Sequence, residues 1–116
     1  MNELNEQIVK SALDKKAENL WLMDVSEDTS ICDFIFVCSA NAQRQVEAIA
    51  DNIKRSIPKS QLLGSEGFEE SLWIILDYGS TIVHVFYEPE RERYSLETLY
   101  GRAKKLSIPQ EYYLSA

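Results

Sequence analysis

The side chains of this chain that could perform acid–base or nucleophilic chemistry are few. His84 is the only histidine among 116 residues, so a metal site with several histidine ligands is excluded. Asp77 is close to it along the chain and could either bond the imidazole or cap a turn. No serine or cysteine beside the pair has the features of an activated nucleophile. A lone histidine in an apolar strand is usually a hydrogen-bonded structural residue, so we expect His84 to be structural and disfavour a hydrolase.

Carboxylates at the ends of predicted strands raise a second kind of chemistry. Asp24, Asp33 and Asp77 occupy such positions, where two-metal phosphoryl-transfer sites place their ligands. Those sites also use closely spaced acids, typically Asp-x-Asp, and the sequence has none. It also lacks the glycine-rich phosphate-binding patterns. We therefore predict no enzymatic activity, no cofactor and no metal, while a degenerate nucleotidyltransferase-like enzyme using these aspartates with magnesium remains the competing hypothesis.

Composition limits the classes of partner. The net charge is −7 and the isoelectric point is near 4.7, so little direct binding of nucleic acid is expected. An acidic surface suits a basic protein partner, although the same charge could serve solubility alone. No apolar run approaches the roughly 20 residues that span a bilayer. The polar N-terminus lacks the features of a targeting signal, so we expect a cytoplasmic protein. Cys32 and Cys38 are predicted to be small buried side chains rather than a disulfide.

Periodicity predicts the elements of the first half of the chain. Apolar residues spaced four apart predict a helix over residues 2–16. Two short apolar runs, residues 20–25 and 33–39, predict antiparallel strands because their connection is short. A second helix is expected over residues 42–56, with Ser39 or Asn41 as its N-cap. A weak edge strand is expected over residues 61–65.

The second half is organised around a hairpin. Leu72–Asp77 and Thr81–Tyr87 are apolar on almost every residue, and Gly79 between them can adopt the positive φ of a tight turn. Such strands belong inside a sheet rather than at its margin. A final helix opens at Pro89, with Leu96, Leu99 and Tyr100 on one face. The order αββα(β)ββα predicts a mixed α/β (α+β) single domain over residues 1–105, followed by a tail of uncertain order over 106–116.

Two blocks of residues together resemble the Iojap-related ribosomal silencing factors. The first block comprises Asp33–Ser39, Arg44–Val46 and Ala48–Asp51. The second comprises Gly64, Glu66-Gly67, Trp73-Ile74, Asp77–Gly79, Ile82–Phe86, Arg91, Arg93-Tyr94 and Leu96–Tyr100. The chain departs from the family pattern at Ala40–Ala42, which stands for Gly-x-Ser, at Ser80, which stands for Asp, and at Tyr100, which stands for Trp. The resemblance covers most of Leu4–Tyr100.

The resemblance implies a nucleotidyltransferase-like fold without its catalytic carboxylates. It also implies binding to the large ribosomal subunit through the fourteenth protein of that subunit. Bound there, family members block joining of the small subunit and lower translation when nutrients are scarce. Free members are often homodimers. A homo-oligomeric adaptor with another partner remains an alternative, because residue types alone do not separate the two.

Aromatic and acidic residues around the hairpin and the final helix are the candidates for partner binding. Tryptophan and tyrosine are the usual anchors of protein interfaces, and acidic side chains would complement a basic ribosomal protein. Trp73 could equally belong to the core. The candidate partner-binding residues are Trp73, Ile75, Asp77, Tyr78, Tyr94, Glu97 and Tyr100, with His84 and Gly79 expected to be structural.

Overall fold

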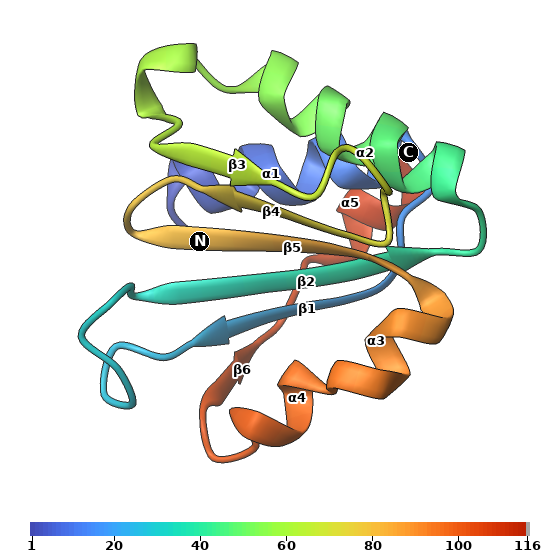
Figure 1. Ribbon diagram of the computed structural model, residues 1–116. Helices are drawn as coiled ribbons and strands as arrows, with labels where there is room; N and C mark the ends of the chain where they lie inside the picture. The colour runs from blue at the N-terminus through green and yellow to red at the C-terminus, as the bar shows by residue number, and fades with distance from the viewer. Residues whose placement is uncertain (116) are drawn as a thin grey trace.

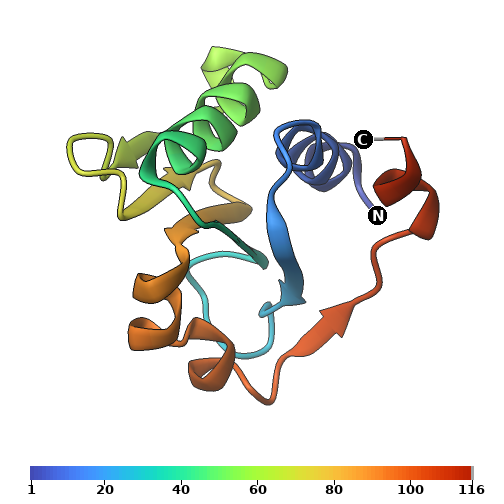
Figure 2. The ribbon, with the colours of Figure 1, turned by 90° about the vertical axis from the view of Figure 1, so that its right-hand side faces the viewer.

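Residues 1–115, which the computed structural model describes, form a six-stranded mixed sheet with helices on both faces (Figures 1 and 2). The mixed α/β class predicted from the sequence is confirmed. The strands are β1 Glu18–Asp24, β2 Phe34–Ala40, β3 Gly64–Glu66, β4 Trp73–Asp77, β5 Thr81–Tyr87 and β6 Lys104–Leu106. The helices are α1 Glu3–Asp14, α2 Gln43–Ser56, α3 Glu88–Tyr94, α4 Leu96–Leu99 and α5 Gln110–Leu114, with a 3-10 turn, η1, at Lys59–Gln61.

The strands follow the order β3-β4-β5-β2-β1-β6 across the sheet. Both predicted antiparallel pairs are present, β1 with β2 and β4 with β5. The two hairpins meet through β2 and β5, which run parallel at the centre of the sheet. β3 pairs with the outer edge of β4, so the weak edge strand exists but begins at Gly64, later than predicted. The hairpin of β4 and β5 therefore lies within the sheet, as expected.

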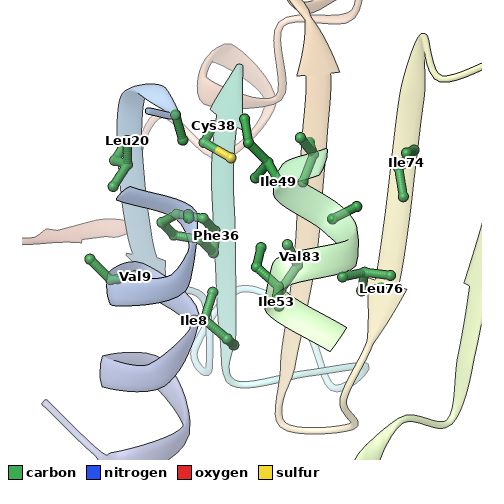
Figure 3. Close-up of a cluster of buried hydrophobic side chains, with 14 of the residues drawn as sticks. Ile8, Val9, Leu20, Phe36, Cys38, Ile49, Ile53, Ile74, Leu76 and Val83 are labelled. Carbon is green, nitrogen blue, oxygen red and sulfur yellow. The ribbon is translucent and has the colours of Figure 1, made fainter. Parts of the chain in front are cut away.

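The larger core lies between the sheet and the pair α1 and α2. Both helices present one apolar stripe, and Figure 3 shows side chains such as Ile8 and Ile53 pointing towards Phe36 and Val83 on the strands. All four of these side chains are fully buried, and burial of each such side chain contributes about 1.5–3 kcal/mol to folding. This packing fixes which side of β4 and β5 faces away from α1 and α2.

The start of α2 differs from the prediction. Its N-cap is Ala42, which makes no side-chain capping bond, so neither Ser39 nor Asn41 caps the helix. Asn41 instead donates from Nδ2 to the Glu18 carboxylate at 3.2 Å. The Ser39 hydroxyl is buried and accepts a hydrogen bond from Arg91. Tertiary partners have taken both candidate caps.

The segment after β5 is broken into two short helices. Ser95 adopts a left-handed conformation (φ 39°), which ends α3 before α4 begins. Leu96 and Tyr100 pack against the second face of the sheet, but Leu99 is 71% exposed. The expectation that Leu99 shares their face is wrong, because α4 is a single turn and buries one narrow stripe.

The last part of the chain packs against the same sheet and helices. β6 pairs with β1 and extends across residue 105, where the sequence placed the end of the domain. Tyr112 of α5 lies against α1, with the Lys10 Nζ 4.7 Å from the centre of its ring. Ala116, the final residue of the expected tail, lies outside the described residues.

The helices bear on membrane spanning, and the two cysteines bear on redox chemistry. Within residues 1–115, the helices are all too short or too polar to cross a bilayer. Cys32 and Cys38 are both buried free thiols, as predicted, and burial raises the pKa of Cys38 to about 12.

Candidate protein-binding surface

The second face of β4 and β5 carries the candidate surface. Side chains alternate between the two faces of a strand, and the antiparallel register places Trp73 opposite Phe86, Ile75 opposite His84 and Asp77 opposite Ile82. These six residues face away from α1 and α2. Helices α3 and α4 lie on this side of the sheet (Figures 1 and 2). They do not cover it completely, because Trp73, Ile75 and Ile82 are only half-buried.

Trp73 is both packed and accessible. Its ring stacks on Phe86 with 4.9 Å between ring centroids, and the centroid of the tilted Tyr94 ring is 4.7 Å away. Tyr94, at the end of α3, is 46% exposed. Trp73 therefore belongs partly to the surface and partly to a smaller core on this face, and truncating it would disturb both. The buried residues of this smaller core are Met23, Val25, Cys32, Ile35, Val37 and Phe86.

His84 is held in the neutral form. It is 9% exposed, and the Trp73 indole Nε1 donates a hydrogen bond to His84 Nδ1 at 3.0 Å. Because an indole N–H can only donate, Nδ1 must keep its lone pair and the ring proton sits on Nε2. Burial lowers the pKa of His84 to about 4. Such a group is a positioning partner for Trp73 at neutral pH.

Tyr78 lies on the opposite face from Trp73. It is 6% exposed and packs in the larger core beneath α1 and α2. Burial raises the pKa of its hydroxyl to about 12. Tyr78 therefore supports the hairpin from behind and offers no exposed surface.

The turn of the hairpin engages Asp77. Its Oδ1 accepts a hydrogen bond from the Gly79 N–H at 2.8 Å, and Gly79 has φ of +81°. Asp77 thus caps the turn and does not bond His84, which pairs with Ile75.

Glu97 is engaged in an ion pair between α3 and α4. Glu97 accepts a hydrogen bond from Arg91 Nε at 2.5 Å, and the two side chains are only 17% and 7% exposed. Arg91 also donates from Nη1 to the Ser39 hydroxyl at 3.0 Å. This ion pair fastens α3 and α4 to β2, so Glu97 is an internal anchor. Tyr100 packs on the second face of the sheet, against the same buried cluster as Trp73.

The aspartates considered for metal chemistry do share one end of the sheet. Asp24 on β1 pairs with Phe34, which follows Asp33 at the start of β2. Phe34 also pairs with Thr81, which begins β5 just after the turn at Asp77. Asp24 accepts hydrogen bonds from the hydroxyl and N–H of Ser26, which lower its pKa. Within residues 1–115, no group of three His, Cys, Asp or Glu side chains is placed to hold a metal ion.

Comparison with known proteins identifies the family. The sequence model of the family described as "Ribosomal silencing factor during starvation" matches residues 1–115. The chain belongs to this family. Among curated members, the ribosomal silencing factor of Halalkalibacterium halodurans is 34% identical over 108 residues, covering 91% of this chain and 92% of its own. That of Bacillus subtilis is 38% identical over 92 residues, covering 78% of each.

Solved structures of silencing-factor relatives share the fold. A crystal structure of a Chromobacterium violaceum protein superposes with a TM-score of 0.83 at 28% identity, covering 93% of this chain and 92% of its own. One from Bacillus halodurans gives a TM-score of 0.80 at 31% identity, with 91% and 98% covered. The curated relatives are named as silencing factors and not as enzymes. Membership of the silencing factor family supports a role in translation regulation and an association with ribosomes.

Sequence reasoning missed several residues that shape this surface. Arg91 was indistinguishable from Arg93 in the run Glu-Arg-Glu-Arg, yet only Arg91 is buried. Phe68 and Glu90 also lie beside Trp73. They come from a loop and a helix whose approach to β4 no periodic pattern encodes.

Proposed function

We propose that this chain binds the large ribosomal subunit through the fourteenth protein of that subunit and blocks joining of the small subunit. Translation would thereby fall when nutrients are limited. The activity needs no chemistry, because a bound protein occupies the surface that the small subunit requires. We place this action in the cytoplasm.

The observation that carries the proposal is the half-open aromatic surface of Trp73 and Tyr94 in a chain of the silencing factor family. Rigid aromatic side chains set among packed neighbours are the usual anchors of stable interfaces. A stable interface buries about 800 Å² on each partner, an area that a sheet face with its flanking helix can supply. The net charge of −7 favours encounter with a basic ribosomal protein.

Within the candidate set, the structure supports different roles for different residues. We assign the contacts with the partner to Trp73, Ile75 and Tyr94, with Asp77 and Tyr100 at the margins of the same face. Tyr78 and Glu97 act from inside, the first by supporting the hairpin and the second by holding Arg91.

We also propose that free copies pair as homodimers through this same face. Exposed apolar surfaces commonly mark sites of protein–protein interaction. A second copy of this chain offers the same half-buried residues as a partner surface. The homodimer and the ribosomal complex would then exclude each other. Sedimentation equilibrium with and without the purified fourteenth protein tests this, and a ternary complex of two copies with that protein would contradict it.

Calorimetric titration of the purified fourteenth protein tests the surface. Tyr94→Ala should weaken binding by at least about tenfold, because hot-spot aromatic residues contribute about 2 kcal/mol or more. Tyr113→Ala is the matched control, since Tyr113 is 41% exposed but lies on α5. Equal affinities for the two variants would remove this face from the proposal. No binding by the unmodified protein would favour an adaptor with another partner.

A further inference from the structure

A groove of about 720 Å³ opens beside the Trp73 surface. It lies between the loop that joins β3 to β4 and helix α3. Its lining includes the aromatic residues Phe68, Trp73 and Tyr94 and the acidic residues Glu66, Glu70 and Glu90. The groove is therefore continuous with the surface proposed for the ribosomal partner, since Trp73 and Tyr94 belong to both.

The loop wall of the groove is built against β4 without spare room. Gly67 has φ of +93°, and a Cβ on it would lie 2.0 Å from the Trp73 carbonyl oxygen. The Ser71 N–H donates to the Gly67 carbonyl at 2.9 Å and closes the loop. A loop fixed in this way holds its side chains in place before a ligand arrives, which lowers the entropy cost of binding.

Aromatic faces in and around the groove already attract cations. Lys54 Nζ lies 4.8 Å from the centre of the Phe68 ring, and the Arg93 guanidinium lies 5.7 Å from that of Tyr94. Such contacts come from the negative face of the ring. These rings therefore favour a cation over an anion, and a partner's cation would compete with Lys54 or Arg93 for them.

The acidic side chains of the groove form no ion pair within residues 1–115. In the described part of the chain, the ion pairs join Lys10 to Glu6 and Arg91 to Glu97, so neither uses a carboxylate of the groove. Four glutamates line it against one arginine, with the Lys54 ammonium over the Phe68 ring as the second cation. This imbalance disfavours an anionic ligand, and an entirely apolar ligand would leave the carboxylates without partners.

We infer that this groove receives an arginine side chain of the basic protein partner, an inference that rests on the proposed function. A guanidinium can stack its plane on an aromatic ring while its edge donates hydrogen bonds to carboxylates. The groove offers both kinds of surface. It thereby supplies the charged part of recognition, and the neighbouring apolar face supplies the rest.

An arginine peptide tests the groove directly. The probe is acetyl-Gly-Arg-Gly-amide, and the control peptide carries citrulline, which keeps the shape but loses the charge. The indole N–H resonance of Trp73, followed by NMR, should shift with the arginine peptide and stay in place with the citrulline peptide. The indole of Trp21 is an internal reference, because Trp21 lies outside the lining of the groove. Equal shifts with both peptides, or none, would overturn the inference.

A charge-matched pair of variants tests the carboxylates. Glu66→Gln, Glu70→Gln and Glu90→Gln combined should weaken binding of the arginine peptide by roughly tenfold, since the loss of each exposed charge contact weakens binding about twofold. The control combines E27Q, E47Q and E92Q, which change the net charge equally outside the groove. Equal weakening in both variants would show that only the overall charge matters and would overturn the inference.

The same two variants separate this inference from the proposed function. If both bind large subunits with the same affinity, the groove has no part in docking and the inference fails while the proposed function stands. If the unmodified protein binds the arginine peptide at Trp73 but does not bind large subunits, the proposed function fails while the cation site remains. Weaker subunit binding by the groove variant alone supports both.

Discussion

His84 should make the stability of this fold fall as the pH is lowered through a defined range. The imidazole is buried and accepts the Trp73 indole hydrogen bond, so the folded chain binds a proton only near pH 4. In the unfolded chain the same group titrates near its ordinary pKa of 6.5. The unfolded state therefore gains protons first. Stability is complete above about pH 6.5 and is lost progressively as the pH falls to about 4.

The size of this effect follows from the difference between the two pKa values. Each unit of difference corresponds to about 1.4 kcal/mol, so the full loss is about 3 kcal/mol, of which about 2 kcal/mol is lost by pH 5. His84 is the only histidine, so no other side chain of ordinary pKa contributes strongly above pH 5. Hydrogen bonds lower the pKa values of Glu6, bonded to Lys10, and Asp24, bonded to Ser26, so they act mainly at more acidic pH.

Urea unfolding near pH 7.5 and near pH 5 measures the effect. His84→Gln keeps a hydrogen-bond acceptor for the Trp73 indole but cannot titrate, so its free energy of unfolding should change by about 2 kcal/mol less between the two conditions. The groups common to both proteins cancel in this comparison. An equal change in the two proteins, or an NMR titration of the His84 ring with a pKa near 6.5, would refute the account of Trp73 and His84.

Four further substitutions have outcomes fixed by the packing. Glu97→Ala leaves the buried Arg91 guanidinium without its carboxylate, so urea unfolding should find the free energy of unfolding lowered by about 3 kcal/mol. A loss below about 0.5 kcal/mol, typical of surface changes, would show that the pair does not anchor α3. Gly67→Ala should lower the free energy of unfolding by more than about 2 kcal/mol, because the new Cβ meets the Trp73 carbonyl. Gly64→Ala has open space around it and should change the free energy of unfolding by less than about 1 kcal/mol. Equal thermal midpoints for the two variants would contradict this. Tyr78→Phe removes a buried hydroxyl that has no hydrogen-bond partner among residues 1–115, so calorimetry should find a thermal midpoint unchanged or raised; a loss of more than about 1 kcal/mol would reveal a partner for it.

The elements that could be predicted are those in which one apolar period dominates. The stripe of α2, Val46 to Ile53, and the continuous apolar runs of β4 and β5 each specify one element type, and all three are confirmed. Local pattern was sufficient where burial and periodicity agreed.

Residues with a choice of partners could not be placed from sequence. Ser39 and Asn41 are good capping residues, but Arg91 and Glu18 bond them instead. Arg91 and Glu97 are six residues apart across the left-handed Ser95, a separation that no helical spacing rule connects. Such pairings depend on how α3 and α4 dock.

The candidate surface shows the same division. Alternation along β4 correctly groups Trp73 with Ile75 and Asp77. The sequence did not show that Tyr78, just beyond the strand, turns into the larger core. Nor did it show how far α3 and α4 would cover Trp73, because that depends on the ion pair beneath them.

We propose that this protein binds the large subunit at the surface where the small subunit joins it. The most direct measurement is sedimentation of the purified protein with isolated large subunits and with joined ribosomes. The protein should migrate with isolated large subunits and not with joined ribosomes, and Tyr94→Ala should reduce this binding while Tyr113→Ala leaves it unchanged. Equal binding to joined ribosomes would place the protein away from the joining surface and contradict the proposed mechanism.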